Sequence, residues 1–388
     1  MKFETDSAIR SPGRSRRLAS AAIALVVSGA ACSADNLLGL DDGSGAVNAG
    51  ANVEAFDMSG GSNCDQLAVA GGSTEQINQT WIKMVAPQDG ATVRAFKPPM
   101  QTGGKVRQAK NVVAVADGNT TVWLLRPDGT VLRSISHDFW VSAMALSADG
   151  SVLITGTIGP NPNWVSPPGA VGWTVFRFDV ATGAEIMPRI ASIQKDDASA
   201  PWITSVAISP DGTTIAAGGA SGVQIWRASD AALLAEIPTP TEEVALSGTE
   251  LAVPGQEAVT FYSLAGERVG QFWAGWGQRV VYSADGTKLA LFTSTDPNGW
   301  DPDPSHFHFL VKVINRPDGT ELATYVDESH GRSVNGEKTP YTIGLAFVEN
   351  DTAVAIGWSD RRVTKFGASD GKTIWSRVVD PGQPVSSP

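Results

Sequence analysis

The hydrophobic and polar positions of the chain follow one recurring pattern, in which short apolar runs alternate with glycine-containing turns. An apolar segment that ends in a tight turn occurs at 141–150 (VSAMALSADG), 203–212 (ITSVAISPDG), 278–286 (QRVVYSADG) and 342–351 (TIGLAFVEND), with a weaker copy at 242–255. A second apolar run follows each of the four at once, such as TTIAAGG after residue 212. Two short runs joined by such a turn are typical of a β-hairpin, because glycine tolerates positive φ.

A second hairpin follows the first in each unit, as in VQIWRASDAALLAEI (223–237) and VKVINRPDGTELATYV (311–326). Each unit therefore predicts four antiparallel strands, called a, b, c and d here in chain order. The b strands are almost continuously apolar, which indicates sheets covered on both faces. Such sheets form when repeated units pack face against face.

Seven such units can be counted between residues 53 and 378, although the first two match the pattern imperfectly. The spacing from Gly212 to Gly248 is 36 residues and from Gly248 to Gly286 is 38 residues, near the period of about 40–45 residues for WD repeats. The predicted fold is all-β, a seven-bladed β-propeller of four-stranded antiparallel blades, with the propeller domain over residues 52–379.

The repeats resemble those of WD-repeat-like and quinoprotein-like β-propellers. Trp226 stands at the position of the tryptophan in the WD dipeptide, and GASDGKTIWS (367–376) is similar to the quinoprotein repeat, with Trp375 as its docking tryptophan. Quinoproteins repeat this motif around the ring, whereas the counterparts of Trp375 are Met187, Leu234 and Ala323. We therefore expect no bound quinone and no other cofactor.

The N-terminal segment has the form of a bacterial lipoprotein signal. A basic stretch, RSPGRSRR, precedes an apolar run at 18–31 that is too short to span a bilayer, and the run ends at Cys32. We expect a signal peptide over 1–31, lipid on Cys32, a flexible tether over 32–51 and a disordered tail over 380–388. Ordinary secretion, with cleavage near Ala31 or Ala34, is the alternative. Cys64 then has no disulfide partner and is expected to be a buried small hydrophobe.

Charge argues against several kinds of partner. The chain has a formal charge of −11, and without residues 1–31, which carry five basic and two acidic side chains, the charge is −14. Such a surface repels phosphate backbones and anionic headgroups. We expect no nucleic-acid partner, membrane attachment through the N-terminal lipid alone, and a monomer.

The long connections predict where a ligand would bind. In a propeller the b–c and d–a connections emerge on one face, and here the four long connections, 157–172, 191–202, 294–309 and 327–341, are all of these two kinds. Loops on a rigid scaffold often carry binding residues, and tryptophan can stack on a sugar or anchor a peptide. The predicted ligand-binding residues are Trp140, Trp164, Trp202, Trp276, Trp300 and Tyr341. The alternative is that these aromatics plug the channel.

Candidate catalytic and metal-binding residues are few. His137 and His330 are the histidines placed for catalysis at the channel mouth, and no nucleophile motif accompanies them. His306 and His308 alternate in an extended segment near three aspartates, which is compatible with a metal, but the common ligand motifs are missing. We expect no metal and no catalytic residues.

The sequence therefore predicts a lipid-anchored protein of the bacterial cell envelope, in the periplasm or on the cell surface. Its expected function is to bind an envelope protein or a glycan through the loop-rich face, without catalysis. Two alternatives stay open: a hydrolase or lyase acting on a sugar or peptide, and an assembly scaffold that uses its sides. The location of exposed apolar side chains should distinguish binding through the loop face from binding through the sides.

Overall fold

The computed structural model describes residues 53–59, 64–73, 81–99, 105–117, 120–158, 173–191, 203–255, 257–273, 279–294, 308–327 and 342–379. These residues belong to one compact unit, Gly45–Pro388. The predicted signal peptide, tether and C-terminal tail lie outside the described residues.

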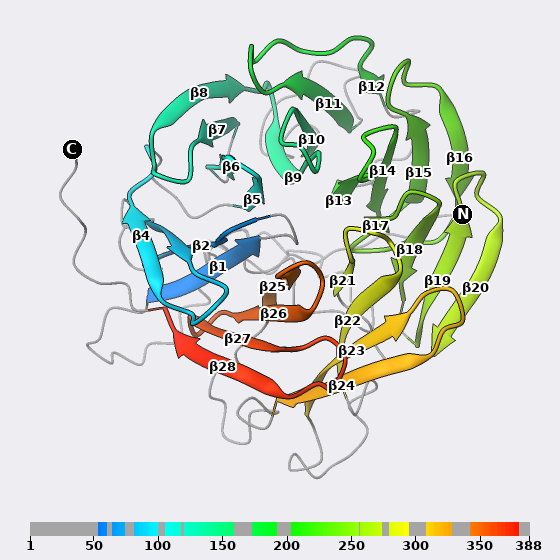
Figure 1. Ribbon diagram of the computed structural model, residues 1–388. Helices are drawn as coiled ribbons and strands as arrows, with labels where there is room; N and C mark the ends of the chain where they lie inside the picture. The colour runs from blue at the N-terminus through cyan, green and yellow to red at the C-terminus, as the bar shows by residue number, and fades with distance from the viewer. Residues whose placement is uncertain are drawn as a thin grey trace, which may run out of the picture. The chain divides into compact units, whose positions relative to one another are not determined.

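The described residues form 28 strands in seven four-stranded antiparallel sheets, arranged as a ring (Figure 1). Blade 1 contains β1 (Val53–Ser59), β2 (Leu67–Ser73), β3 (Trp81–Val85) and β4 (Thr92–Phe96). Blade 2 contains β5 (Val106–Ala109), β6 (Val112–Ala116), β7 (Thr121–Leu125) and β8 (Val131–Ser136). Blade 3 contains β9 (Trp140–Leu146), β10 (Val152–Ile158), β11 (Thr174–Asp179) and β12 (Ile190–Ala191).

The remaining blades follow the same order. Blade 4 contains β13 (Ile203–Ile208), β14 (Thr214–Gly219), β15 (Gly222–Arg227) and β16 (Leu233–Ile237). Blade 5 contains β17 (Ala245–Leu246), β18 (Glu250–Pro254), β19 (Ala258–Ser263) and β20 (Arg268–Trp273). Blade 6 contains β21 (Arg279–Tyr282), β22 (Lys288–Ser294), β23 (Phe309–Asn315) and β24 (Glu321–Asp327). Blade 7 contains β25 (Thr342–Val348), β26 (Ala353–Trp358), β27 (Arg362–Gly367) and β28 (Thr373–Val378).

The predicted seven-bladed propeller is confirmed, and blades 1 and 2 are both complete. The a strands line the centre of the ring and the d strands its outer edge (Figure 1). Every blade is built from one continuous stretch of chain, so the ring closes by packing blade 7 against blade 1. Met58 and Leu67 of blade 1 share a core with Ile343 and Trp375 of blade 7.

Two hydrogen bonds across the closing junction converge on one carbonyl. Trp375 Nε1 donates to Pro87 O at 2.8 Å, and the buried Lys365 Nζ donates to the same oxygen at 2.9 Å. Lys365 also pairs with Glu349 at 2.6 Å. The tryptophan expected to dock blade 7 therefore does so, against the c–d turn of blade 1.

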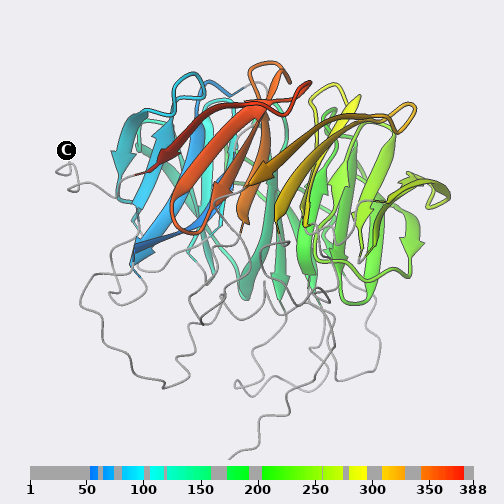
Figure 2. The same ribbon diagram turned by 90° about the horizontal axis from the view of Figure 1, so that it is seen from below.

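The a–b turns of blades 3, 4 and 6 share one set of hydrogen bonds. In blade 4, Ser209 Oγ donates to Asp211 Oδ1 at 2.5 Å, and the same oxygen accepts from Thr213 N at 3.1 Å. Gly212 adopts φ 71°, which a side chain would disfavour. These bonds explain why the Ser-x-Asp-Gly sequence recurs: each residue satisfies a polar group of the turn. Figure 2 shows the short turns along the upper edge of the ring.

Glycines in the b strands allow the next blade to approach closely. A Cβ on Gly156 would lie 2.8 Å from Ile203 Cγ2 of blade 4, and one on Gly218 would lie 2.8 Å from Val244 Cγ1 of blade 5. A Cβ on Gly357 would lie 2.9 Å from Ile343 Cγ1 and 3.0 Å from Met58 Sδ of blade 1. These contacts explain why the TGT, AGG and IGW segments each contain a glycine. The alternation of apolar and polar residues alone does not require a glycine there.

The outer strand of blade 3 is shorter than its sequence suggests. The pattern through AEIMPRI predicts a full d strand, but β12 pairs only Ile190 with Val175 and Ala191 with Thr174. Pro188 has no N–H for the ladder and is joined to Met187 by a cis peptide bond. Nearer the c–d turn Glu185 bridges Phe178 and Ile186 N donates to Arg177 O, so the outer strand of blade 3 is interrupted between Ile186 and Ile190.

Candidate functional site

The strand ends that flank the long connections lie at one end of the blades. Trp140, the first residue of β9, pairs with Ile158, the last residue of β10. At the same end Thr174, which begins β11, pairs with Ala191 of β12. The b–c and d–a connections of an antiparallel blade therefore start and finish together, at the end opposite the short turns. We call this the loop-bearing end.

Trp140 is the predicted ligand-binding residue that falls within the described part of the chain. Its side chain is half-buried at the start of an innermost strand, next to the channel. The other predicted residues lie outside the described residues: Trp164, Trp202, Trp276, Trp300 and Tyr341, together with His306, His330 and Cys32.

His137 is a structural residue at the junction of blades 2 and 3. Its Nδ1 lies 3.3 Å from Thr120 O and its Nε2 lies 2.8 Å from Thr155 Oγ1. Because a carbonyl only accepts, Nδ1 carries the proton and Nε2 accepts from the threonine hydroxyl. The ring is buried and meets Phe176 and Phe178 edge to face. Burial lowers the pKa of His137, so the neutral form is favoured. Both ring nitrogens are engaged, which leaves neither free for proton transfer.

Cys64 and His308, which were also considered in the sequence analysis, lie in the described part of the chain. Cys64 is buried, as predicted, and burial raises the pKa of its thiol. His308 is half-buried, and among the described residues no three histidine, cysteine or acidic side chains gather as a metal site. The described chain contains no helix long and apolar enough to cross a membrane.

Trp273 is an exposed tryptophan at the loop-bearing end that the sequence analysis did not single out. It ends β20, pairs with Ala258 and is 66% exposed. A tryptophan with so much of its surface in water is uncommon in a folded protein. The available signal was its place as the last residue of a d strand, where the side chain is no longer covered by the neighbouring blade.

The exposed large apolar side chains of the described residues lie on the outer strands. Ten belong to d strands, and Met187 lies three residues before one: Val93, Val131, Met187, Leu233, Leu234, Val269, Trp273, Leu322, Val326, Ile374 and Val378. Exposed apolar area thus lies around the sides of the ring, with Trp273 at the corner between the sides and the loop-bearing end.

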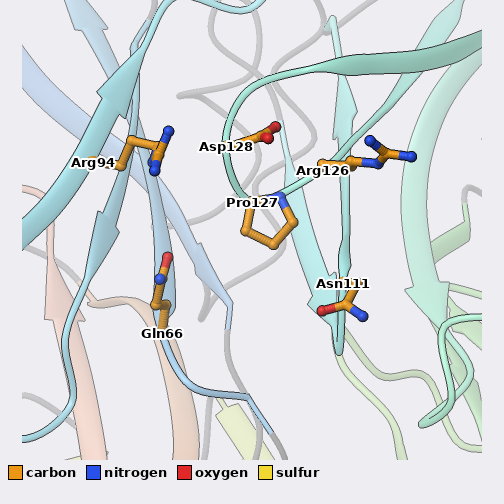
Figure 3. A pocket seen from close by; sticks show the side chains of 6 residues that line it. All are labelled: Gln66, Arg94, Asn111, Arg126, Pro127 and Asp128. Carbon is orange, nitrogen blue, oxygen red and sulfur yellow. The ribbon is translucent and has the colours of Figure 1, made fainter.

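A shallow hollow of about 430 Å³ lies between blades 1 and 2 at the short-turn end (Figure 3). Gln66 and Arg94 line one side, and Asn111 with the turn Arg126–Pro127–Asp128 lines the other. In Figure 3 the guanidinium of Arg126 points away from that of Arg94. Hydrogen bonds from Thr130 lower the pKa of Asp128, which stays ionised beside them. The two arginines therefore do not form a clamp for one anion.

Comparison with known proteins agrees with the fold. The family model described as WD domain, G-beta repeat matches residues 192–227, which include the first three strands of blade 4. The resemblance to WD-repeat-like propellers is thus confirmed for one repeat in sequence and by the ring of seven blades in structure. A search of curated proteins found no match.

Two solved structures illustrate the similarity. The computationally designed Ika8 protein is 14% identical, with a TM-score of 0.53 over 86% of this chain and 90% of that chain. Hydrazine synthase of Kuenenia stuttgartiensis is 18% identical, with a TM-score of 0.49 over 68% of this chain and 76% of that chain. At 14% identity the likeness to the designed protein concerns the fold alone.

Proposed function

We propose that this protein is a lipid-anchored β-propeller of the bacterial cell envelope that binds a partner protein without catalysis. The observation that carries the proposal is Trp273, two-thirds exposed beside the loop-bearing end. Exposed tryptophans that become buried in a partner are common energetic centres of protein interfaces. Trp140 lies at the same end, where the four long connections begin and finish.

A protein partner suits this surface better than a glycan. Val269, on the same strand as Trp273, is 54% exposed, and Val326 on the outer strand of blade 6 is 42% exposed. Aliphatic side chains gain free energy by leaving water against another apolar surface, whereas sugar hydroxyls would lose hydrogen bonds there. The role of His137 as a bonded, buried residue also favours binding over acid–base catalysis.

A second candidate function is supported by the outer strands. Exposed valine and leucine on six d strands place most exposed apolar side chains of the described residues at the sides of the ring, as expected for an assembly scaffold that contacts partners there. The two functions differ in whether the essential contacts lie at the loop-bearing end or at the outer edge.

Affinity capture from solubilised envelopes, followed by measurement of binding to the purified partner, tests both functions. If the proposal holds, Trp273→Ala and the double variant Trp202→Ala/Trp276→Ala weaken binding at least tenfold, since a buried tryptophan at an interface contributes about 2 kcal/mol or more. Ile374→Ala, an exposed apolar change on the outer strand of blade 7, serves as the matched control and leaves binding unchanged.

The opposite pattern, with Ile374→Ala or Val131→Ala weakening binding and the tryptophan variants neutral, supports the scaffold. Lipid attachment is tested separately by labelling cells with an alkyne fatty acid. Cys32→Ser should abolish both the label and membrane retention, and retention of either would contradict the anchor.

A further inference from the structure

A second hollow, of about 360 Å³, lies between blades 3 and 4 at the short-turn end. We call it the blade 3–4 hollow. Its aliphatic walls come from Val152, Ile186, Ile208 and Ile215. The lining also includes Arg177, Gly212, Thr213, Arg227, Ala228 and Ser229. At this end the outer segment of blade 3 pairs with β11, since Glu185 bridges Phe178 and Ile186 N donates to Arg177 O at 2.7 Å.

Arg177 is a buried cation without an anionic partner. Its side chain comes from β11 and is only 2% exposed. Nη2 donates to Pro188 O at 2.6 Å and Nη1 donates to Ala228 O of blade 4, while the buried Nε has no hydrogen-bond partner. Within the described chain no carboxylate forms an ion pair with it. Three of its five N–H donors therefore remain unused.

The two carboxylates that act electrostatically on Arg177, Asp230 and Glu185, are already paired with other arginines. Glu185 accepts from Arg189 Nε at 2.6 Å and Nη2 at 2.9 Å, and Asp230 accepts from Arg227 Nη1 at 2.9 Å. A third carboxylate, Asp211 in the turn that lines the hollow, accepts hydrogen bonds from Ser209 and Thr213. Among the described residues, Arg177 therefore has no carboxylate of its own beside the apolar cavity.

The turn glycine of blade 4, at the mouth of the hollow, is not in contact with the preceding blade, whereas the turn glycines of blades 3 and 6 are. No atom lies within 4 Å of a Cβ position on Gly212, the glycine of the blade 4 turn. The corresponding glycines of blades 3 and 6 meet the preceding blade, Gly150 at Ala109 O (3.1 Å) and Gly286 at Ser247 Cβ (3.2 Å). An incoming molecule therefore has access at this junction that it lacks at those two.

We propose that the blade 3–4 hollow binds a small monocarboxylate with an apolar body, such as a medium-chain or aryl-substituted acid. The carboxylate meets the unused donors of Arg177, and the aliphatic walls bury the apolar body. Charge-assisted hydrogen bonds between a guanidinium and a carboxylate are strong when water is excluded. A volume of about 360 Å³ lies at the small end of the range for small-molecule sites, which limits the ligand to a short acid.

Isothermal titration of the full chain with four probes tests the proposal: octanoate, 3-phenylpropionate, 1-octanol and acetate. Saturable 1:1 binding is expected for octanoate or 3-phenylpropionate. 1-Octanol, which keeps the apolar chain but lacks charge, should bind at least tenfold more weakly than octanoate. Acetate, which keeps the charge but lacks the apolar body, should show no saturable binding.

Variants then locate the site. Arg177→Met keeps the apolar volume but removes the charge, and should weaken binding of the acid at least tenfold. Ser229→Trp, at the lining of the hollow, should block the acid while leaving Arg177 in place. Arg126→Met, in the separate hollow of Figure 3, is the matched control and should change the affinity less than twofold. Circular dichroism confirms that each variant is folded.

Several results would overturn the proposal: no saturable binding of either acid, equal affinity for octanoate and 1-octanol, equal affinity for acetate, or unchanged affinity in both Arg177→Met and Ser229→Trp. None of these results affects the proposed partner binding, which depends on Trp273 and the loop-bearing end.

Discussion

Two junctions of the ring each contain an arginine shielded from water, the buried Arg177 of blade 3 and the half-buried Arg316 of blade 6, and these two arginines have different partners. Arg316, which follows β23, donates from Nε to Glu250 Oε1 at 2.6 Å and from Nη2 to Glu250 Oε2 at 2.7 Å. Glu250 belongs to blade 5, so this bidentate pair joins blades 5 and 6. Arg177 reaches across the junction of blades 3 and 4 to a backbone carbonyl instead.

Two further residues stabilise the ion pair of Arg316 with Glu250. Its guanidinium carbon lies 3.4 Å from the ring centre of Phe261, and Tyr282 donates to Glu250 Oε1 at 2.9 Å. Burial opposes the charge of Arg316, but the bonds to Glu250 raise its pKa, whereas burial lowers the pKa of Arg177. Burial and the adjacent Glu250 carboxylate also raise the pKa of Tyr282.

An arginine at a junction between blades can therefore have two outcomes. With a carboxylate and an aromatic face beside it, the arginine joins two blades. Without them, the charge is held by carbonyls alone and an apolar hollow remains open next to it. The predictions below test this difference.

The largest effect is expected from Glu250→Ala, which leaves Arg316 buried without its carboxylate. Removing one partner of a buried ion pair costs about 3–5 kcal/mol, and because both side chains keep some exposure we expect about 3 kcal/mol. Urea denaturation followed by tryptophan fluorescence measures the loss. The double variant Glu250→Leu/Arg316→Met should recover most of it, and a loss below about 1 kcal/mol would show that the pair does not join the blades.

A smaller effect is expected from Gly156→Ala, which tests whether the junction of blades 3 and 4 is tight away from its hollow. The new methyl group would press on Ile203 and Val206, at 2.8 and 3.1 Å. Overpacking of this kind costs about 1–3 kcal/mol. Gly248→Ala, which faces open space, is the control and should be neutral. Equal denaturation midpoints for the two variants would mean that the inner junction is also loose.

Acid should weaken the turns at the two junctions alike, because they share the same hydrogen bonds. Bonds from Ser283 and Thr287 lower the pKa of Asp285 to about 2, and bonds from Ser209 and Thr213 lower that of Asp211. A lowered carboxyl pKa stabilises the fold above the unfolded value, and this stability is lost as the pH falls from about 4 towards 2. Solvent screening limits each contribution to below about 1 kcal/mol.

Denaturation midpoints between pH 4.5 and 2.5 measure this loss. Asp285→Asn and Asp211→Asn should each reduce the dependence of the denaturation midpoint on pH by a similar amount. If the midpoint of both variants depends on pH as strongly as that of the wild type, the carboxylates responsible for acid sensitivity are not those of Asp285 and Asp211.

The smallest effect on stability is expected from Arg177→Met. Replacing a buried charge that lacks a counterion by an apolar side chain of similar length is expected to change the free energy of unfolding by less than about 1 kcal/mol in either direction. Thermal denaturation of this variant beside Arg316→Met makes the comparison directly. An equal, large loss for both would show that Arg177 joins its blades as firmly as Arg316 does.

Much of the fold was predictable from local sequence. The Ser-x-Asp-Gly turns and the apolar runs beside them are properties of ten to fifteen consecutive residues, and they led to the correct number of blades. The burial of Cys64 and the docking of Trp375 were also predictable. The short β12 was not, although Pro188 gave a signal, and Trp273 was missed because exposure at the end of a strand depends on how far the neighbouring blade extends.

The sequence by itself determined the repeat, the strand order within each blade and the end of the ring at which the long connections occur, because hydrogen bonding within a blade involves segments adjacent in the chain. Only the tertiary structure decided which charged groups meet across the blades. Arg316 finds a carboxylate 66 residues away, while Arg177 finds a carbonyl 51 residues away. That choice depends on how two separately formed sheets pack, and no periodicity within either sheet encodes it.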